Sequence, residues 1–359
     1  MNQGVKRQDY TLLIIVLFLI CFGLITLYST SAYNGQVKFA DPGYYLKKQL
    51  FATILGVVAM LIVSRMDYHI FGKFALYAYL LSLALSGAVL IFGDSYNGSK
   101  RWLSLGPLSF QPSEFAKLAV ILFLAYMVSS QKKKRGNVFL ISMVIGLVLP
   151  IVGLVGTNNL STAIIILGIA VILIFVSNPK YLQFIWIGAV GIGFISIFLS
   201  MESYRLERLA IWKNPENFEK GFQTIQGLYA IGSGGLFGRG LGESIQKLGF
   251  VPEAQNDMIF SIICEELGLT GAIILIIIFI VMIWRFMVIA THARDLFGSL
   301  IAVGVMGHIA IQVMLNIAVV TNTIPNTGIT LPFISYGGTS VLFLLSEMGL
   351  ALSVSRWQK

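Results

Sequence analysis

The stretch that decides the fold is "LGLTGAIILIIIFIVMIWRFMVI", residues 267–289. Apart from Arg285, near its end, it contains no charged side chain. An α-helix rises 1.5 Å per residue, so this stretch would be about 35 Å long. The hydrocarbon core of a bilayer is about 30 Å thick. The stretch therefore predicts a transmembrane helix.

The rest of the chain has the same character. Of its 359 residues, 57% are hydrophobic and only 11% are charged, whereas soluble domains carry about 25% charged residues. The sequence predicts an all-α, polytopic transmembrane protein with about ten spans, formed as one integral membrane domain over residues 1–359, since no linker divides the chain. The expected spans lie near 11–31, 45–64, 69–92, 112–129, 137–155, 160–177, 181–200, 257–289, 297–322 and 338–355.

Charge in the short loops predicts the orientation. With both termini cytoplasmic, the inner loops and termini hold 13 Lys and Arg residues and the short outer loops hold five. Lys and Arg favour the cytoplasmic side, and this bias also accounts for the net charge of +9 without a nucleic-acid partner. The connection 201–256 then becomes one long extracytoplasmic loop. Cys21 and Cys264 lie in separate apolar segments and indicate neither a disulfide nor a zinc site.

Carboxylates precede the apolar stretch in "PEAQNDMIFSIICEELG", residues 252–268. A helix from Asp257 to Ile289 would be about 50 Å long, so its first turns must project outward or line a water-filled cavity. Asp257 is a candidate N-cap and a candidate general base, and the two roles are not exclusive because both favour the anion. Glu265 and Glu266 point about 100° apart on a helix, so they are not expected to share one role, and at least one of them is expected to pair with a cation or a backbone group from another helix.

Two other polar groups interrupt apolar spans. Glu114 and Lys117 are spaced i, i+3, so they form either a functional ion pair or a pair that only fixes helix packing. His308, Gln312 and Asn316 form a stripe that either links helices by hydrogen bonds or lines a cavity. No His, Asp or Glu cluster has metal-ligand spacing.

A glycine-rich segment, "IGSGGLFGRGLG" at 231–242, superficially suggests a nucleotide site. It lies in the expected outer loop and lacks the strand–turn–helix context that such a site requires. Its glycines are expected to permit positive φ angles and close packing instead.

Three separated blocks resemble the SEDS family, whose members are FtsW, RodA and SpoVE. They are "GSKRWLSLGPLSFQPSEFAK" (98–117), "AIGSGGLFGRGLGESIQKLGFVPEAQNDMIFSIICEELG" (230–268) and "PNTGITLPFISYGGTS" (325–340). The resemblance covers nearly the whole chain and is most similar to the FtsW type of Gram-positive bacteria. It implies a peptidoglycan glycosyltransferase that polymerises lipid II in septal cell-wall synthesis, located in the bacterial plasma membrane at the division septum.

The resemblance also implies roles for particular residues. It transfers the family's essential aspartate to Asp257, as general base, and its fourth-span acid and base to Glu114 and Lys117. The leaving group, undecaprenyl pyrophosphate, is already acidic, so one base suffices and the other need is positive charge beside the diphosphate. The predicted substrate-binding residues are Glu114, Lys117, Arg101, Lys100, Arg205 and Arg208.

Partners and alternatives complete the sequence-based hypothesis. The resemblance implies a class B penicillin-binding protein, a transpeptidase, as partner, together with other membrane proteins of the division machinery. A divalent cation, Mg or Mn, is a candidate cofactor, although no metal ligand is assigned. The alternatives are a flippase or transporter for the lipid-linked precursor, an elongation polymerase of the RodA type, and a scaffold without enzymatic activity.

Overall fold

The computed structural model describes residues 8–96, 99–105, 108–131, 137–177 and 203–358, together with 188, 189, 191 and 193. Within these ranges nine expected spans appear as helices, and the span expected near 181–200 lies mostly outside them. The helices are α1 (Tyr10–Phe39), α2 (Tyr44–Arg65), α3 (Tyr68–Phe92), α4 (Pro112–Gln131), α5 (Asn137–Asn158), α6 (Leu160–Ser177), α10 (Ile259–His292), α11 (Leu296–Val320) and α12 (Gly338–Arg356).

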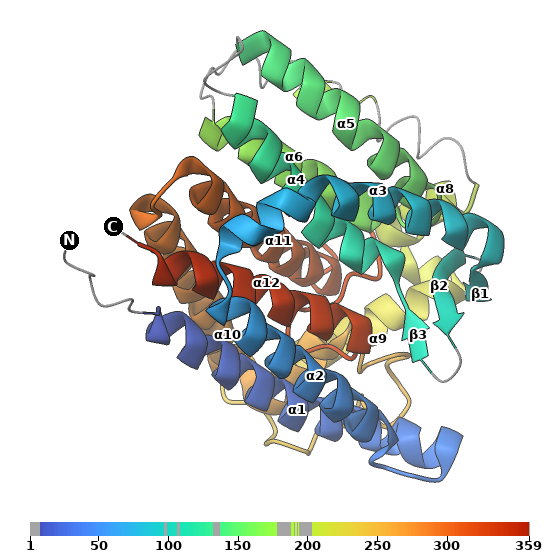
Figure 1. Ribbon diagram of the computed structural model, residues 1–359. Coiled ribbons are helices and arrows are strands. Elements are labelled where there is room, and N and C mark those ends of the chain that lie inside the picture. The colour runs from blue at the N-terminus through green and yellow to red at the C-terminus, as the bar shows by residue number, and fades with distance from the viewer. Residues whose placement is uncertain are drawn as a thin grey trace.

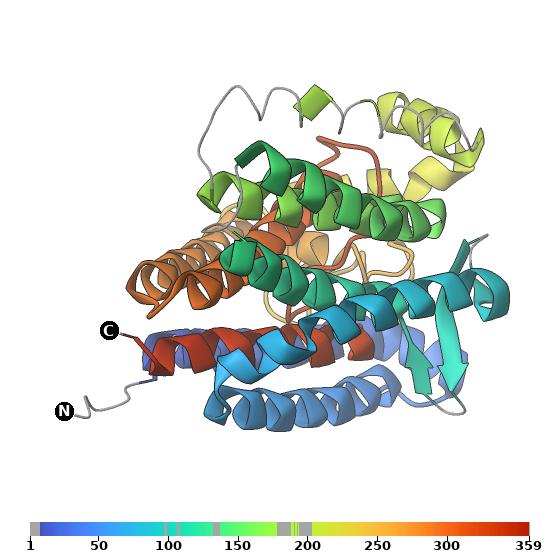
Figure 2. The same ribbon diagram turned by 45° about the horizontal axis from the view of Figure 1, so that its top comes forward.

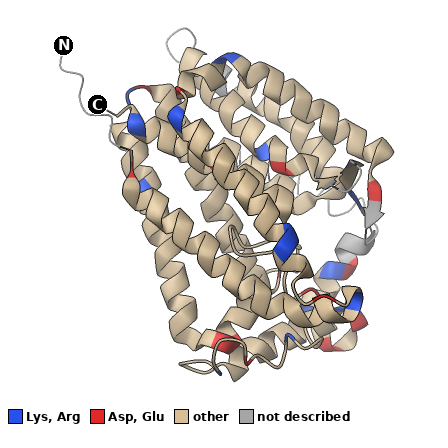
Figure 3. Cartoon of the chain, turned by 60° about the horizontal axis from the view of Figure 1, so that its bottom comes forward, with Lys and Arg blue, Asp and Glu red and all other residues tan. Residues whose placement is uncertain are grey.

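These helices form a bundle with both chain ends at the same end, as the predicted topology requires (Figure 1). Eight of the described helices are long and apolar enough to cross a membrane, and α5 contributes a shorter apolar helix over Ser142–Asn158. Figure 2 shows the helix axes running broadly in one direction. Charged residues are concentrated toward the two ends of the bundle (Figure 3). The all-α polytopic prediction is confirmed.

Burial separates central helices from peripheral ones. In the most apolar window of α12, 72% of residues are buried inside the protein, against 22% for α2. The corresponding values for α4 and α11 are both 61%. Because buried positions contact other helices and exposed apolar ones can face lipid, α4, α11 and α12 form the centre of the bundle. The buried polar side chains of these three helices include Lys117, His308, Gln312 and Glu347.

Aspartates cap several helices at the end that carries the chain termini. The Asp9 carboxylate accepts from the N–H of Leu12 at 2.9 Å, and the Asp295 carboxylate accepts from the N–H of Gly298 at 2.8 Å. Such caps satisfy backbone donors that have no partner within the helix. Asp9 also pairs with Arg285 of α10 at 2.5 Å, which joins α1 to α10.

The opposite end, here called the outer end, carries the structured connections. Three short strands, β1 (Asp94–Tyr96), β2 (Ser99–Leu105) and β3 (Leu108–Phe110), form an antiparallel sheet in the order β1-β2-β3. The long connection contains helices α8 (Ser203–Lys213) and α9 (Phe222–Ser233) and two 3-10 turns, η1 (Pro215–Asn217) and η2 (Glu219–Gly221). The sequence predicted a loop here without identifying these elements.

The glycine-rich segment explains a break in α10. Gly268 interrupts this helix with φ 68° and ψ −169°. The backbone N–H groups of Arg239 and Gly240 donate to the carbonyls of Glu265 and Glu266, and those of Leu269 and Thr270 donate to the carbonyls of Gly235 and Leu236. These hydrogen bonds satisfy the polar groups that the break frees, a requirement for irregular backbone at membrane depth.

The glycine-rich segment can approach α10 closely because Gly268 and Gly238 have no side chains. A Cβ on Gly268 would lie 2.3 Å from the Gly238 nitrogen, and one on Gly238 would lie 2.2 Å from the Glu266 carbonyl oxygen. The expectation of positive φ and close packing for this segment is confirmed. The segment Ile259–Leu267, which follows Asp257, is thus fixed separately from the rest of α10.

Candidate active site

Asp257 lies in the turn before α10, at the outer end. The N-cap of α10 is Met258, which makes no side-chain capping bond, so the interpretation of Asp257 as an N-cap is wrong. The Asp257 side chain is half-buried. A carboxylate that lies outside the helix and is not used as a cap is available for other contacts.

Two amide side chains contact Asp257. Gln223 of α9 donates from Nε2 to Asp257 Oδ1 at 3.3 Å. Asn316 of α11 donates from Nδ2 to the Asp257 main-chain carbonyl at 2.9 Å. Gln223 Oε1 in turn accepts from Asn326 at 3.4 Å, and Arg208 of α8 donates to the Asn326 carbonyl at 3.1 Å. Residues from α8, α9, α11 and the loop 321–337 are therefore linked around Asp257, and Gln223 contacts its carboxylate directly.

The surroundings of Asp257 change its acidity. Burial, reinforced by the negative charge of Glu253, raises the pKa of Asp257 to about 6. Arg208 and the hydrogen bond from Gln223 act in the opposite direction. A general base works best when its pKa lies near the operating pH, so this carboxylate is suited to accept a proton near neutrality.

A buried polar network lies deeper in the bundle. Lys117 Nζ is 3.1 Å from Glu114 Oε1, and both side chains are almost fully buried. Lys117 also donates to Gln312 Oε1 at 3.1 Å. His308 contacts Gln312 Oε1 at 2.8 Å through Nε2 and Glu347 of α12 at 2.7 Å through Nδ1. The predicted Glu114–Lys117 pair is present on α4, and the network that includes it joins α4 to α11 and α12.

This network reaches the Asp257 region through the loop 321–337. Gln312 Nε2 donates to the carbonyl of Thr330 at 3.0 Å. One turn farther along α11, Asn316 Nδ2 donates to the carbonyl of Ile329 at 2.7 Å as well as to that of Asp257. The stripe on α11 thus forms interhelical and loop hydrogen bonds, the first of its two predicted roles.

Lys100 and Arg101 lie on β2, apart from the contacts of Asp257. Lys100 Nζ is 3.4 Å from the carbonyls of Leu90 and Ile91, and Arg101 Nε donates to the carbonyl of Asn158 at 2.9 Å. Both line a cavity of about 20 Å³ between β2 and the ends of α3, α4 and α5. Arg205 belongs to α8, but its side chain is outside the described part of the structure.

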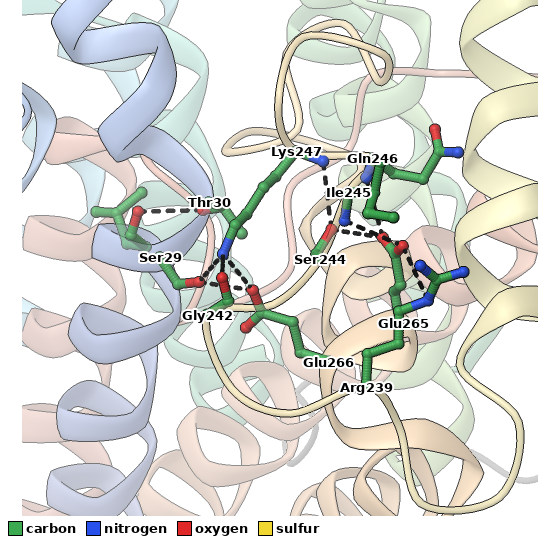
Figure 4. Close-up of polar contacts among 11 residues, drawn as sticks. Ser29, Thr30, Arg239, Gly242, Ser244, Ile245, Gln246, Lys247, Glu265 and Glu266 are labelled. Atoms are coloured by element: carbon green, nitrogen blue, oxygen red, sulfur yellow. Dashed lines mark hydrogen bonds and ion pairs between the residues drawn. The ribbon is translucent and has the colours of Figure 1, made fainter.

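The two glutamates in α10 anchor it to the long connection, as Figure 4 shows. Glu265 accepts from the Ser244 hydroxyl and from the N–H groups of Ile245 and Gln246. Glu266 pairs with Lys247 at 2.8 Å and accepts from Ser29 of α1 at 2.6 Å. The two acids therefore contact separate groups, in agreement with the expectation that they do not share one role.

An apolar groove of about 660 Å³ lies beside this anchor. Its walls come from α1, the start of α2 and the segment 241–248. The α1 wall is connected to the turn that carries Asp257, because Asn34 donates to Gln255 Oε1 at 3.0 Å. The groove therefore lies on an element that also contacts the Asp257 turn.

Residues 10–359 match the family of cell cycle proteins that groups FtsW, RodA and SpoVE. The chain belongs to this family. FtsW/RodA/SpoVE membership and the apolar helices together establish it as a multi-pass membrane protein.

Individual relatives match over almost their full lengths. Stage V sporulation protein E of Bacillus subtilis is 42% identical, with 100% of each chain covered. A probable peptidoglycan glycosyltransferase FtsW of Trichlorobacter lovleyi is 37% identical, with 97% of this chain and 93% of that protein covered. A chain from a structure of a peptidoglycan synthase complex that coordinates polymerization and crosslinking superposes with a TM-score of 0.81 at 28% identity, covering 98% of this chain and 99% of that one.

Sequence reasoning assigned no role to two residues that lie around Asp257. Gln223 is a single polar residue in a connection where polar residues are common, and Asn326 lies in the block 325–340, which carried the resemblance without pointing to this residue. Only the tertiary structure shows that they contact each other and the Asp257 region. The i, i+4, i+8 spacing did single out Asn316, but not its contact with Asp257.

Proposed function

We propose that this protein is a peptidoglycan glycosyltransferase that polymerises lipid II, with Asp257 as the general base. The observation that carries the proposal is a half-buried carboxylate at the outer end with a pKa of about 6. The family supports the reaction class, since relatives include proteins named peptidoglycan glycosyltransferase FtsW. In the predicted orientation this carboxylate lies on the side where lipid II sugars are exposed.

The chemistry needs one base and a positive environment. Asp257 takes the proton from the C4 hydroxyl of the acceptor sugar as its oxygen attacks the anomeric carbon of the donor. The bond from that carbon to the diphosphate breaks, and the diphosphate leaves as an anion without a proton. Arg208, whose charge acts on Asp257 in the described structure, would stabilise the negative charge that develops on the departing diphosphate.

The other predicted substrate contacts remain part of the proposal. Arg205 lies on the same helix as Arg208 and would add to the positive charge. Lys100 and Arg101 would bind substrate at the β2 side of the bundle. Glu114 and Lys117 would support the substrate cavity indirectly. Lys117 binds Gln312, and Gln312 donates to the carbonyl of Thr330 in the loop 321–337. The groove beside α1 is apolar and would accept an isoprenyl chain.

A divalent cation has limited protein ligands at this site. Within the described residues no group of three or more His, Cys, Asp or Glu side chains could hold a metal ion. Mg²⁺ is commonly bound by one or two carboxylates plus substrate phosphates, so Asp257 and substrate oxygens would have to share it. If Mg or Mn assists, EDTA should abolish polymerisation and adding back the cation should restore it. Full activity in EDTA would refute the requirement.

The decisive experiment is a lipid II polymerisation assay with purified protein. The parent should produce glycan strands on a gel, and folded Asp257→Asn should produce none. Glu243→Gln is a matched control because Glu243 is an exposed carboxylate of the same long connection. Parent-level polymerisation by Asp257→Asn would refute the base assignment.

Transport and scaffold functions predict other results. A flippase would move labelled lipid II across liposomes without forming polymer. A scaffold would support growth with Asp257→Asn in place. Polymer formed by the parent alone contradicts both alternatives.

The physiological role is proposed to be septal, with a class B penicillin-binding protein and other division proteins as partners. A related chain in a peptidoglycan synthase complex supports a crosslinking partner. The similarity to stage V sporulation protein E also makes spore-wall synthesis a second candidate role. Loss of the gene should block division in the septal case, block only sporulation in the second, and cause rounding if the role is elongation.

A further inference from the structure

Three polar side chains of α11, His308, Gln312 and Asn316, form what we call the α11 ladder. Their exposed fractions are 1%, 2% and 0%. Buried polar groups are costly unless they are hydrogen-bonded, so the partners of these side chains indicate what the ladder does. Those partners come from α4, α12, the loop 321–337 and the Asp257 turn.

Asn316 is the rung next to Asp257. Its Nδ2 donates to two carbonyl oxygens, Asp257 O at 2.9 Å and Ile329 O at 2.7 Å. Carbonyls accept only, so the chemistry of the partners requires the amide nitrogen to face them. Both N–H groups of one side chain are therefore used to join two segments that are far apart in the sequence.

Gln312 is the next rung, one helical turn away. It donates to the carbonyl of Thr330, the residue after Ile329, at 3.0 Å. Its Oε1 accepts from Lys117 and contacts His308. Consecutive turns of α11 thus bind consecutive carbonyls of the loop 321–337, which aligns the loop with the helix, and only the Asn316 rung also includes Asp257.

We propose that Asn316 is a positioning residue for Asp257, fixing the main chain of the base against the loop 321–337. This inference rests on the proposed function. The main-chain bond limits where the Asp257 carboxylate can lie, while Gln223 contacts Oδ1 from the other side. Gln312 stabilises the same loop at the adjacent residue and connects it to the Glu114–Lys117 pair.

The first test replaces Asn316 by a residue of similar size without donors. Asn316→Leu should lower kcat by about 10- to 100-fold, because a small misplacement of a reacting group has effects of this size. KM for lipid II should change less than about twofold, and the acid limb of the pH–rate profile should shift, since the surroundings of the base change. A role confined to folding would lower the yield of folded protein without changing these properties.

Two further variants calibrate the result. Asn316→Ser retains one donor, which can bind only one of the two carbonyls, so its kcat is expected to lie between those of the parent and Asn316→Leu. If Asn316→Leu fails to fold, Asn316→Ser provides the test in its place. Met314→Ala is the control, because Met314 lies on the same helix and is 69% exposed. Hydrogen exchange at 326–331 should be faster in the Asn316 variants than in Met314→Ala.

The two single variants, Asp257→Asn and Asn316→Leu, separate this inference from the proposed function. An inactive Asp257→Asn together with Asn316→Leu of parent kcat and pH profile would overturn the inference alone. An Asp257→Asn variant with parent activity would overturn the proposed function and the role of Asn316 with it.

Discussion

At the residue scale, the acidity of Asp257 makes the first prediction. Its pKa of about 6 means that the anion, the form that accepts a proton, predominates only above that pH. The rate of polymerisation should therefore rise with pH and reach half of its plateau near pH 6. Initial rates between pH 4.5 and 8.5 would check this. A profile that is flat from pH 5 to 8 would contradict it.

The same residue predicts a stability effect of defined sign. Burial raises the pKa of Asp257 above its ordinary value of 3.8, so ionisation in the folded state is disfavoured relative to the unfolded chain. The resulting loss of stability develops as the pH rises from about 4 through 6 and is complete above it. Asp257→Asn removes this charge and should unfold at a higher temperature than the parent at pH 8, with little difference at pH 4.

The buried pair Glu114–Lys117 makes a third residue-scale prediction. Lys117→Met leaves the Glu114 carboxylate buried without its cation and should destabilise the protein by about 3–5 kcal/mol. Combining it with Glu114→Gln removes the uncompensated charge and should recover much of the unfolding temperature. Thermal unfolding in detergent would measure both. Equal destabilisation by the single and double variants would show that the pair itself is unimportant.

At the element scale, the break in α10 depends on Gly268. Gly268→Ala places a side chain at φ 68° and a Cβ 2.3 Å from the Gly238 nitrogen, so the segment 234–242 must move away. We expect the strained backbone conformation alone to lower the free energy of unfolding by about 1–3 kcal/mol. Polymerisation should also be reduced, because the start of α10 shifts.

Gly232→Ala is the matched control for this prediction. Gly232 lies in α9, and nothing lies within 4 Å of a Cβ built there. Alanine favours a helix over glycine, so this variant should unfold at the parent temperature or slightly above it. Equal unfolding temperatures for Gly268→Ala and the parent would show that the segment 234–242 does not depend on the break.

At the scale of the whole molecule, the arrangement predicts which segments face which side of the membrane. In a background with Cys21 and Cys264 replaced by serine, Glu243→Cys should react with a membrane-impermeant maleimide in intact protoplasts. Gln358→Cys should react only after permeabilisation, because the C-terminus lies at the opposite end from the outer segments (Figure 1). Labelling of Gln358→Cys in intact protoplasts would contradict the predicted orientation.

Sequence by itself determined the membrane architecture. Long apolar runs must form helices in a bilayer, because backbone polar groups there need internal partners, and the run 267–289 illustrates this. Local spacing also predicted the Glu114–Lys117 pair and separate roles for Glu265 and Glu266, since residues within one helix have fixed relative directions.

Only the tertiary structure decided how the site is assembled. Contacts of Gln223, Asn316 and Asn326 around Asp257 join residues that are far apart in the sequence, and no local period encodes such pairs. The break at Gly268 likewise depends on a segment some 30 residues earlier that supplies its hydrogen bonds. The sequence specifies which groups are available, and the packing of distant elements specifies which of them meet.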